Sequence, residues 1–344
     1  MTSRRHGRLG TVLPVWRGIR WGSLLVVALC LVGCGAKVDL SKVTYTRTTV
    51  PPAGRTTTSG PPKTNDPAFT AAKLRGIDAC ALLDKDILTK VGTPDENDVI
   101  DFSRCSNFMK DLEGNDLSIT VTLGEGLLED PAEADKNIGG LPAFSSELDD
   151  HTACFVNVVT STNPNIGIRV QIGGDDDADL CAAGQTILTG VVDLIRKDPP
   201  EREAATGTIA AADPCTLLEP GALKTLLAGA DTTATPYTLH WCQWIGDTLS
   251  ADVWFRTGYD PKDTTVDPGT PLDLGNGVTV YQHADGTGAD ASCRLEWRHR
   301  STGSDGDDEI IEVDFDNQAA AAGDNGCATA AEIAKLLIPA LPKA

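Results

Sequence analysis

The sequence predicts an α+β fold made of two similar domains, each an antiparallel sheet flanked by N- and C-terminal helices and stapled by disulfides. Three observations predict it. A cysteine-bearing phrase occurs twice, the cysteines of the two halves follow similar spacings, and short segments of alternating polarity lie between helical patterns in both halves. A chain of 344 residues has room for two domains of ordinary size.

The repeat begins with a shared phrase. Residues 77–88 read IDACALLDKDIL and residues 212–223 read ADPCTLLEPGAL, so both place an Asp, a Cys, a Leu-Leu pair and a closing Leu at matching positions. Three later segments keep the register, namely 116–123 with 248–255, 153–159 with 292–298, and 166–172 with 309–315. Two copies in the same order indicate a duplicated domain.

Helices are expected at both ends of each copy. Asp213 can cap the free amides of a helix and Pro214 suits its first position, and the apolar residues that follow recur on one face. The phrase at 77–88 predicts the same opening helix in the first copy. Closing helices are expected over 181–197 and 327–338, the second of them stopped by Pro339. The alternating runs between these ends predict the strands of the sheet.

The cysteines are expected to form disulfides. Eight remain after the N-terminal segment: Cys80, Cys105, Cys154, Cys181, Cys215, Cys242, Cys293 and Cys327. Four cysteines in a domain allow three pairings, and sequence alone does not choose among them. If the opening and closing helices pack on the strands that carry the other cysteines, the favoured pairs are 80–105, 154–181, 215–242 and 293–327. Zinc is the competing interpretation, but the chain has no Cys-x-x-Cys pair, and an oxidising exterior favours disulfides.

The N-terminal segment has the pattern of an export signal. Arginines lead into the apolar run GSLLVVALCLVGC, which is too short to span a bilayer. Its end, Leu31-Val32-Gly33-Cys34, resembles the lipobox of bacterial lipoproteins, and this resemblance implies cleavage before Cys34 and lipid attachment to its thiol. An ordinary secretory signal with an incidental cysteine is the alternative. The pair Arg4-Arg5 suggests a twin-arginine signal, but the apolar residues that such a signal prefers do not follow it.

These patterns divide the chain into five parts. Residues 1–33 are the signal peptide, and 34–74 form a disordered tether rich in Thr and Pro, because such a composition buries too little apolar surface to offset chain entropy. The first repeat domain covers 75–198, a charged linker covers 199–209, and the second repeat domain covers 210–344. The expected location is therefore extracytoplasmic, with the protein held at the cell membrane by its N-terminal lipid.

Charge restricts the partners. The net charge is −20, and the signal peptide contains arginines but no acidic residue, so the rest of the chain is more acidic still. Such a chain repels phosphate backbones, and we expect no nucleic-acid partner. The acidity is also typical of a well-solvated exported protein.

The sequence contains no pattern typical of catalysis. Gly-x-Ser-x-Gly, phosphate-loop and dinucleotide glycine patterns are absent. The two copies do not share their histidines, and His240 aligns with Ser103. The acid-rich loops at 173–181 and 303–309 lack the glycine and distal glutamate that an EF-hand requires. We therefore expect no catalytic, cofactor-binding or metal-binding residue, and no enzyme.

Tryptophan provides the strongest candidate for a binding surface. The four tryptophans after the signal, Trp241, Trp244, Trp254 and Trp297, all lie in the second copy. Strand alternation places Trp244 and Trp297 in the core and leaves Trp241 beside Trp254 on the outer face. Arg294, Arg298 and Arg300 are expected on that face too, and aromatic residues interleaved with arginine are typical of recognition surfaces. The alternative is that this face packs against the first domain.

Taken together, the lipobox, the Thr/Pro tether, the Asp-x-Cys-x-Leu-Leu helix start and a Cys followed by an aromatic residue, as in CQW at 242–244, resemble the actinobacterial lipoproteins of the family of unknown function DUF3558. The resemblance covers both halves, so the chain would be a tandem member. The first copy departs from the pattern, because Cys105 is followed by Ser-Asn-Phe and no Trp. We expect a non-catalytic module that binds an envelope ligand or protein. The alternatives are a structural or regulatory accessory of a membrane or wall complex, and an unrecognised hydrolase.

Overall fold

The computed structural model describes residues 66–175, 178–203, 205–227, 233–285, 291–303, 306–319 and 325–343. The predicted signal peptide, Cys34 and residues 35–65 of the predicted tether lie outside the described residues. Both sheets belong to one compact unit that covers residues 57–344.

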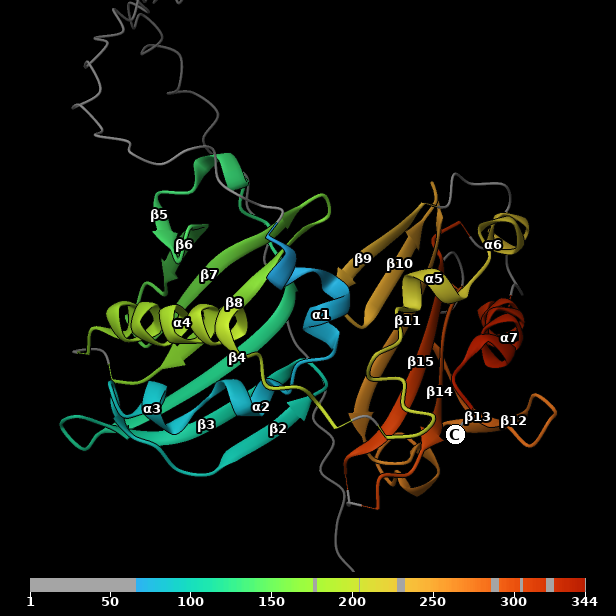
Figure 1. Cartoon of the computed structure of the whole chain (residues 1–344). Coiled ribbons are helices and arrows are strands. Elements are labelled where there is room, and N and C mark those ends of the chain that lie inside the picture. Colours follow the sequence, from blue (N-terminus) through green and yellow to red (C-terminus); the bar gives the residue numbers. More distant parts are fainter. Residues whose placement is uncertain are drawn as a thin grey trace, which may run out of the picture. The chain divides into compact units, whose positions relative to one another are not determined.

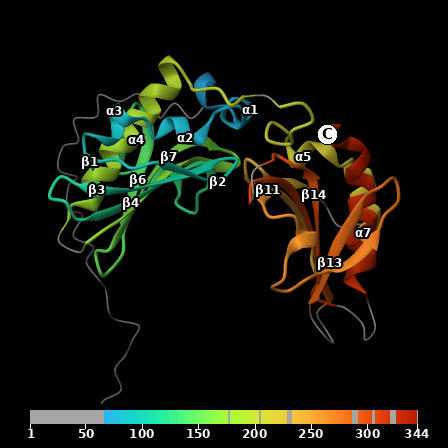
Figure 2. The ribbon, with the colours of Figure 1, turned by 90° about the horizontal axis from the view of Figure 1, so that it is seen from below.

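The first domain is an antiparallel sheet of eight strands with helices on one face (Figures 1 and 2). Strands run in the order β1-β3-β4-β8-β7-β6-β5, and β2 also pairs with β3. The long helix α4 (Leu180–Lys197) packs on β7 and β8, as Figure 1 shows. The strands are β1 (Gly92–Thr93), β2 (Asn97–Asp101), β3 (Arg104–Asp111), β4 (Asp116–Gly126), β5 (Lys136–Ile138), β6 (Leu141–Glu147), β7 (Ala153–Thr162) and β8 (Asn165–Gly173). The other helices are η2 (Pro67–Phe69), α1 (Ala71–Arg75), α2 (Ala79–Leu82), α3 (Lys85–Leu88) and η3 (Pro131–Glu133).

The second domain repeats this plan with seven strands in the order β12-β13-β14-β15-β11-β10-β9. Helix α7 (Gly326–Leu337) packs on β14 and β15, in the place that α4 takes on the first sheet. The strands are β9 (Ala234–Thr238), β10 (Trp241–Ile245), β11 (Leu249–Gly258), β12 (Thr270–Asp273), β13 (Thr279–Asp285), β14 (Ala291–Arg300) and β15 (Asp308–Asn317). The other helices are α5 (Pro214–Leu217), α6 (Pro220–Leu226), η4 (Pro261–Asp263) and η5 (Ile338–Ala340).

The two sheets have the same topology. When the second sheet is followed from its edge strand β9, the strands β10-β11-β15-β14-β13 come in the order that corresponds to β3-β4-β8-β7-β6 of the first sheet. The predicted fold class, α+β with two similar antiparallel domains, is confirmed.

Each opening helix is broken in two, unlike the single helix that the sequence predicts. In the first domain the chain leaves α2 at Leu83, and the side chain of Asp84 accepts a hydrogen bond from the amide of Asp86 and starts α3. In the second domain the break falls at Glu219, because Pro220 begins α6 and disfavours helical geometry in the residue before it. The apolar periodicity continues across both breaks, so it did not reveal them.

The end of the predicted tether is folded, which corrects the boundary at residue 74. Residues 67–69 form η2 and residues 71–75 form α1, with Phe69 buried. Asp66 caps η2 and pairs with Arg196 of α4 at 2.9 Å. A buried aromatic residue and an Asp-Pro helix start outweigh the surrounding Thr/Pro composition at this point.

Disulfides join each helix layer to its sheet. The bonds are Cys80–Cys105, Cys154–Cys181, Cys215–Cys242 and Cys293–Cys327, the same pairs that the sequence favours. In each domain one bond ties the opening helix to the first central strand and the other ties the closing helix to β7 or β14. Loops of this size stabilise a fold by about 3–4 kcal/mol each in the chain-entropy model.

The domains exchange one apolar side chain each at equivalent turns. Phe102, between β2 and β3, is part of the second domain's core, and Leu239, between β9 and β10, is part of the first domain's core. Both are nearly fully buried. Gly124 makes room for Leu239, because a Cβ there would come within 2.1 Å of the leucine Cγ.

Buried polar contacts surround this exchange. The Arg75 guanidinium donates to the carbonyl of Leu239 at 2.8 Å and pairs with Asp213, which caps α5. Arg202 donates to the carbonyl of Phe102, the equivalent turn residue of the other domain. The two arginines, one from α1 and one from the segment between the domains, therefore satisfy equivalent backbone carbonyls.

Candidate functional site

The outer face of the second sheet, opposite α7, is where strand alternation gathers the most unusual side chains. Neighbouring strands place Trp241, Trp254, Glu312, Glu296 and Tyr281 in one row across the sheet. The next row contains Gln243, Asp252, Asp314, Arg294 and His283. The core-facing partners of these residues, such as Trp244 and Trp297, are buried as alternation predicts.

Four side chains form a ladder along one end of this face. The rings of Tyr237 and Trp241 lie 4.5 Å apart, those of Trp241 and Trp254 stack at 5.7 Å, and the Arg256 guanidinium lies 5.6 Å from the centre of the Trp254 ring. We call these four residues, together with Asp252, Asp314, Glu312, Glu296 and Arg294, the tryptophan face. Tyr237 ends the ladder with half of its surface exposed, and both tryptophans are half-buried.

Hydrogen bonds and ion pairs hold the ladder in place. The indole N–H of Trp241 donates to the carboxylate of Asp252 at 2.8 Å. Arg256 pairs with Glu312 at 3.1 Å and with Glu296 at 3.2 Å. Because these ion pairs are mostly buried, they orient the side chain of Arg256 and its two glutamates more firmly than exposed pairs would. The tryptophan rings are therefore fixed before any ligand arrives.

Carboxylates outnumber arginines on the tryptophan face. Burial, followed by the neighbouring Glu312 and Asp252, raises the pKa of Asp314 to about 8. Burial also raises the pKa of Asp252 and of Glu312. The rise follows because ionising Asp314 would add a charge beside like charges in a poorly hydrated place. At neutral pH the carboxyl group of Asp314 accordingly holds its proton.

Of the three arginines that the sequence places on this face, the structure brings only Arg294 into the ion-pair network, where it pairs with Glu296 at 3.0 Å. Arg298 lies at the far end of β14 and pairs with Asp260 at 2.6 Å. Arg300 bonds Glu309, whose carboxylate also accepts from the amide of Ile209. Arg298 keeps the alternation but lies one row beyond Glu296, opposite Ile310, and a register shift between Arg298 and Arg300 ends the alternation of β14 before Arg300.

Sequence reasoning missed Arg256. The signal was available, because residues 252, 254 and 256 alternate onto one face of β11, and Trp254 was expected on that face. The adjacent turn residues Leu239 and His240 contact the first domain. Strand β11 contacts it as well, because the amide of Thr257 donates to the carboxylate of Asp101 at 3.1 Å and its hydroxyl donates to the carbonyl of Ile100 at 3.3 Å. The ring contacts of Trp241 and Trp254 given above are all made within the second domain.

His240 and Ser103 make the pair that most resembles a catalytic dyad in the described residues. The Ser103 Oγ lies 2.8 Å from Nδ1 of His240, and Nε2 of His240 lies 2.7 Å from the carbonyl of Ala210. Both side chains are buried at the domain interface, and burial lowers the pKa of His240 to about 3. A ring that stays neutral and does not reach solvent acts as a structural link, so this pair supplies no support for a hydrolase.

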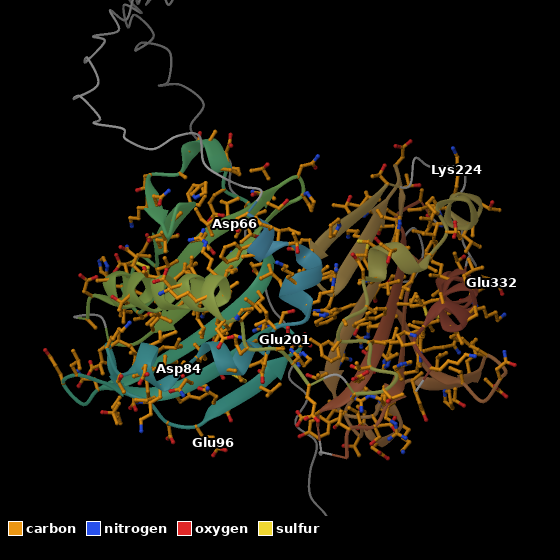
Figure 3. The ribbon with its side chains drawn as sticks, in the orientation of Figure 1. Asp66, Asp84, Glu96, Glu201, Lys224 and Glu332 are labelled. Atoms are coloured by element: carbon orange, nitrogen blue, oxygen red, sulfur yellow. A yellow bond between two sulfur atoms is a disulfide. The ribbon has the colours of Figure 1, made fainter. Side chains whose placement is uncertain are left out.

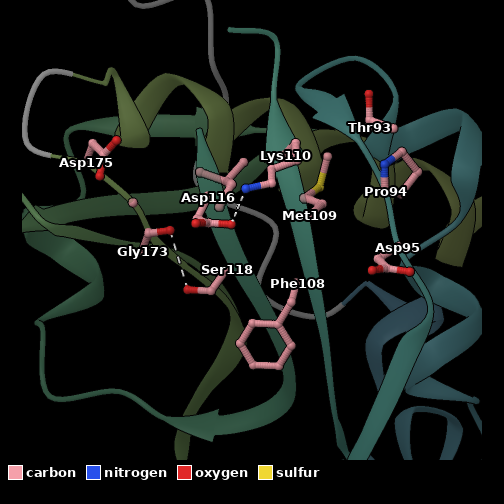
Figure 4. A pocket seen from close by; sticks show the side chains of 12 residues that line it. Thr93, Pro94, Asp95, Phe108, Met109, Lys110, Asp116, Ser118, Gly173 and Asp175 are labelled. Carbon is pink, nitrogen blue, oxygen red and sulfur yellow. Dashed lines mark hydrogen bonds and ion pairs between the residues drawn. The ribbon is translucent and has the colours of Figure 1, made fainter. Parts of the chain in front are cut away.

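A hollow on the first domain has a volume of about 800 Å³ (Figure 4). It is lined by the exposed ring of Phe108 on β3, by the ion pair of Lys110 with Asp116, and by the turn after β8. The Ser118 hydroxyl donates to the carbonyl of Gly173 at 3.4 Å. This hollow thus offers one aromatic ring and a solvent-exposed ion pair, which is a weaker recognition set than the tryptophan face.

Within the ranges that the structure covers, no three or more His, Cys, Asp or Glu side chains are grouped so that they could hold a metal ion. No helix in the same ranges is long and apolar enough to cross a membrane.

Comparison with known proteins yields few relatives. No curated protein matches the chain. Among solved structures, the apo structure of the immunity protein TplEi of T6SS from Pseudomonas aeruginosa is similar at 8% identity, covering 70% of this chain and 96% of that chain, with a TM-score of 0.26. A score this low supports no conclusion about fold or function.

A family model described as "Protein of unknown function (DUF3558)" matches residues 29–194. The match extends from the end of the apolar N-terminal run into α4 of the first domain. That the second domain is another copy of the same family unit stays a prediction, although its sheet has the same topology. Residues 29–194 of the chain are thus similar to the DUF3558 family of proteins of unknown function, and this match supports membership in that family.

Proposed function

We propose that the protein is a lipid-anchored, extracytoplasmic and non-catalytic binding module that contacts a ligand or partner of the cell envelope through the tryptophan face. The observation that carries this proposal is the stacked, half-buried pair Trp241 and Trp254 on a sheet face that lies opposite α7. Ordered aromatic rings contribute contact area at a low entropic cost on binding.

The contrast between the domains supports the same assignment. At the positions equivalent to Trp241 and Trp254, the first domain has Arg104 and Thr122, which pair across β3 and β4. The core positions of the two sheets are apolar in both domains, as the fold requires. Large aromatic residues on the outer face are not needed to form this fold, so they are available for recognition.

The predicted extracytoplasmic, lipid-anchored location rests on the sequence and on cysteine chemistry. The arginine-led apolar run ends in the lipobox-like Leu31–Cys34, and all the cysteines from Cys80 onward are paired. Disulfides persist in oxidising compartments. We expect the native protein to enter the detergent phase in a cloud-point extraction and the Cys34→Ala variant to remain in the aqueous phase. Recovery of both proteins in the aqueous phase would contradict the lipid anchor.

Binding is tested by hydrogen exchange of the full chain in the presence of fractionated envelope material. We expect peptides from β10 and β11 to become protected by one fraction, and expect this protection to disappear in the double variant Trp241→Ala, Trp254→Ala. The control is Phe108→Ala, which removes an exposed aromatic ring from the first domain. Equal protection in the wild type and the double tryptophan variant would refute the proposed binding face.

A further inference from the structure

We propose that the occupant of the tryptophan face is a basic polypeptide segment of a partner protein, with a lysine or arginine side chain directed at the carboxylates between β11 and β15. The inference rests on the proposed function, because it names the class of partner for the same face. It is carried by the balance of charge on that face and by the order of the side chains around it.

The first step is the charge balance. The tryptophan face contains the carboxyl groups of Asp252, Glu296, Glu312 and Asp314, and only two arginines, Arg256 and Arg294, lie among them. Both arginines already pair with glutamates of this face. Asp252 and Asp314 lie directly opposite each other on β11 and β15, so two carboxyl groups adjoin, and burial holds a proton on Asp314 that a bound cation would displace.

The second step is the aromatic border. Asp252 accepts the indole hydrogen bond of Trp241, and Trp254 lies opposite Glu312 on the neighbouring strand. Aromatic rings attract cations through their π faces, and carboxylates beside them neutralise the charge. Tyr237 is exposed at the end of the ladder and can cover the aliphatic stem of a lysine or arginine. An anionic or purely apolar partner would leave the surplus carboxylates buried without a counter-charge.

The third step concerns the size of the occupant. The face extends over β10, β11, β15 and β14. A single small amine covers only one part of it, whereas a polypeptide can place a cation at Asp252 and Asp314 and apolar side chains against the ladder. A partner segment with basic and apolar residues in alternation fits both features.

Proton release is a specific consequence. Burial and like charges raise the pKa of Asp314, and a bound cation favours its ionised form. The charged groups that face Asp314 are Asp252 on β11, Glu312 and Asp316 on β15 and Arg294 on β14, with His283 next in the row on β13. Binding should therefore release a proton and become tighter as the pH rises towards 8.

The test uses the full chain at physiological salt, with hexalysine and a Lys-Leu alternating hexapeptide as probes and their acetylated forms as neutral controls. Tryptophan emission reports occupancy. We expect the alternating peptide to bind more tightly than hexalysine and its acetylated form to bind at least tenfold more weakly. Calorimetry in two buffers of different ionisation heat should show proton release in the wild type and not in Asp314→Asn.

Matched charge variants separate a site from general attraction to an acidic protein. Asp252→Asn with Asp314→Asn should weaken binding at least tenfold and keep the fold, since neither residue pairs with an arginine in the ion pairs given above. Glu96→Gln with Glu332→Gln also removes two carboxyl groups, and at least as much charge at neutral pH, from exposed positions that lie elsewhere on the surface (Figure 3), and it should change binding less than twofold. Equal losses in the two pairs would overturn the proposal.

Other outcomes are equally decisive. The same emission change with Ca²⁺ alone or with spermidine alone would overturn the polypeptide assignment. If the basic peptides fail to bind while the double tryptophan variant still loses protection in envelope material, the cationic partner is wrong and the proposed function stands. If the tryptophan variant loses nothing, the proposed function itself fails.

Discussion

Replacing Phe102 with Ala is expected to destabilise the second domain, although the residue belongs to a turn of the first. Phe102 is only 4% exposed and packs in the second domain's core. Its ring lies 5.2 Å from that of His240, and the Arg202 guanidinium lies 5.9 Å from its centre. Truncation of a buried phenylalanine to alanine costs about 3–5 kcal/mol, and loss of the ring contacts places this site within that range.

Urea denaturation followed by tryptophan emission measures this effect. Every tryptophan after the predicted signal peptide lies in the second domain, so the emission reports that domain selectively. With a urea dependence of about 2–3 kcal/mol/M for a protein of this size, the midpoint should fall by about 1–2.5 M.

The control is Phe108→Ala, which removes the same side chain from a position that is 61% exposed. It should leave the free energy of unfolding unchanged within about 0.5 kcal/mol, as surface substitutions do. If Phe102→Ala shifted the midpoint no more than Phe108→Ala, the reasoning that the two cores exchange side chains would be refuted.

Four further predictions concern the same framework. Replacing Cys215 and Cys242 together with Ala should lower the free energy of unfolding by about 3 kcal/mol, measured by urea denaturation, and an unchanged midpoint would contradict the structural role of this disulfide. Stability should fall as the pH drops from about 6.5 towards 3, because burial lowers the pKa of His240 to about 3 and only the unfolded chain takes up that proton. Asp101→Asn should make stability fall more steeply between about pH 6 and 4. Burial raises the pKa of Asp101 to about 6, so in the wild type its protonation stabilises the folded state as the pH falls through that range, and the variant lacks this gain. Denaturation at several pH values measures the effect, and parallel stability curves for the two proteins would exclude it. Arg75→Met should cost about 2–4 kcal/mol in a thermal or urea melt, since it leaves a buried carbonyl and a carboxylate unpaired, and a neutral result would show that water replaces the guanidinium.

Local patterns in the sequence predicted much of the framework. The repeated phrase and the cysteine spacing predicted two similar domains, and the helix and strand periods predicted which residues of β10, β11 and β14 face the core. The disulfide pairs followed from the same reasoning, because a helix must turn its apolar stripe, cysteine included, towards the sheet. The pairing of Trp241 with Trp254 needed only the alternation of side chains along a strand.

Tertiary structure decided the features that depend on where a local pattern is interrupted or on which distant segment is nearby. The shift after Arg298 moves Arg300 away from the tryptophan face, and Asp84 and Pro220 divide helices whose apolar stripe is continuous. The exchange of Phe102 and Leu239 joins turns that are far apart in sequence. The sequence by itself determined the duplication and most of the secondary structure, because those follow from periods of a few residues, and it favoured one set of disulfide pairs once the helices were placed on the sheets. Only packing decided the domain interface and the membership of the tryptophan face, because a turn or a bulge costs little energy locally and is fixed by the contacts that it makes across the fold.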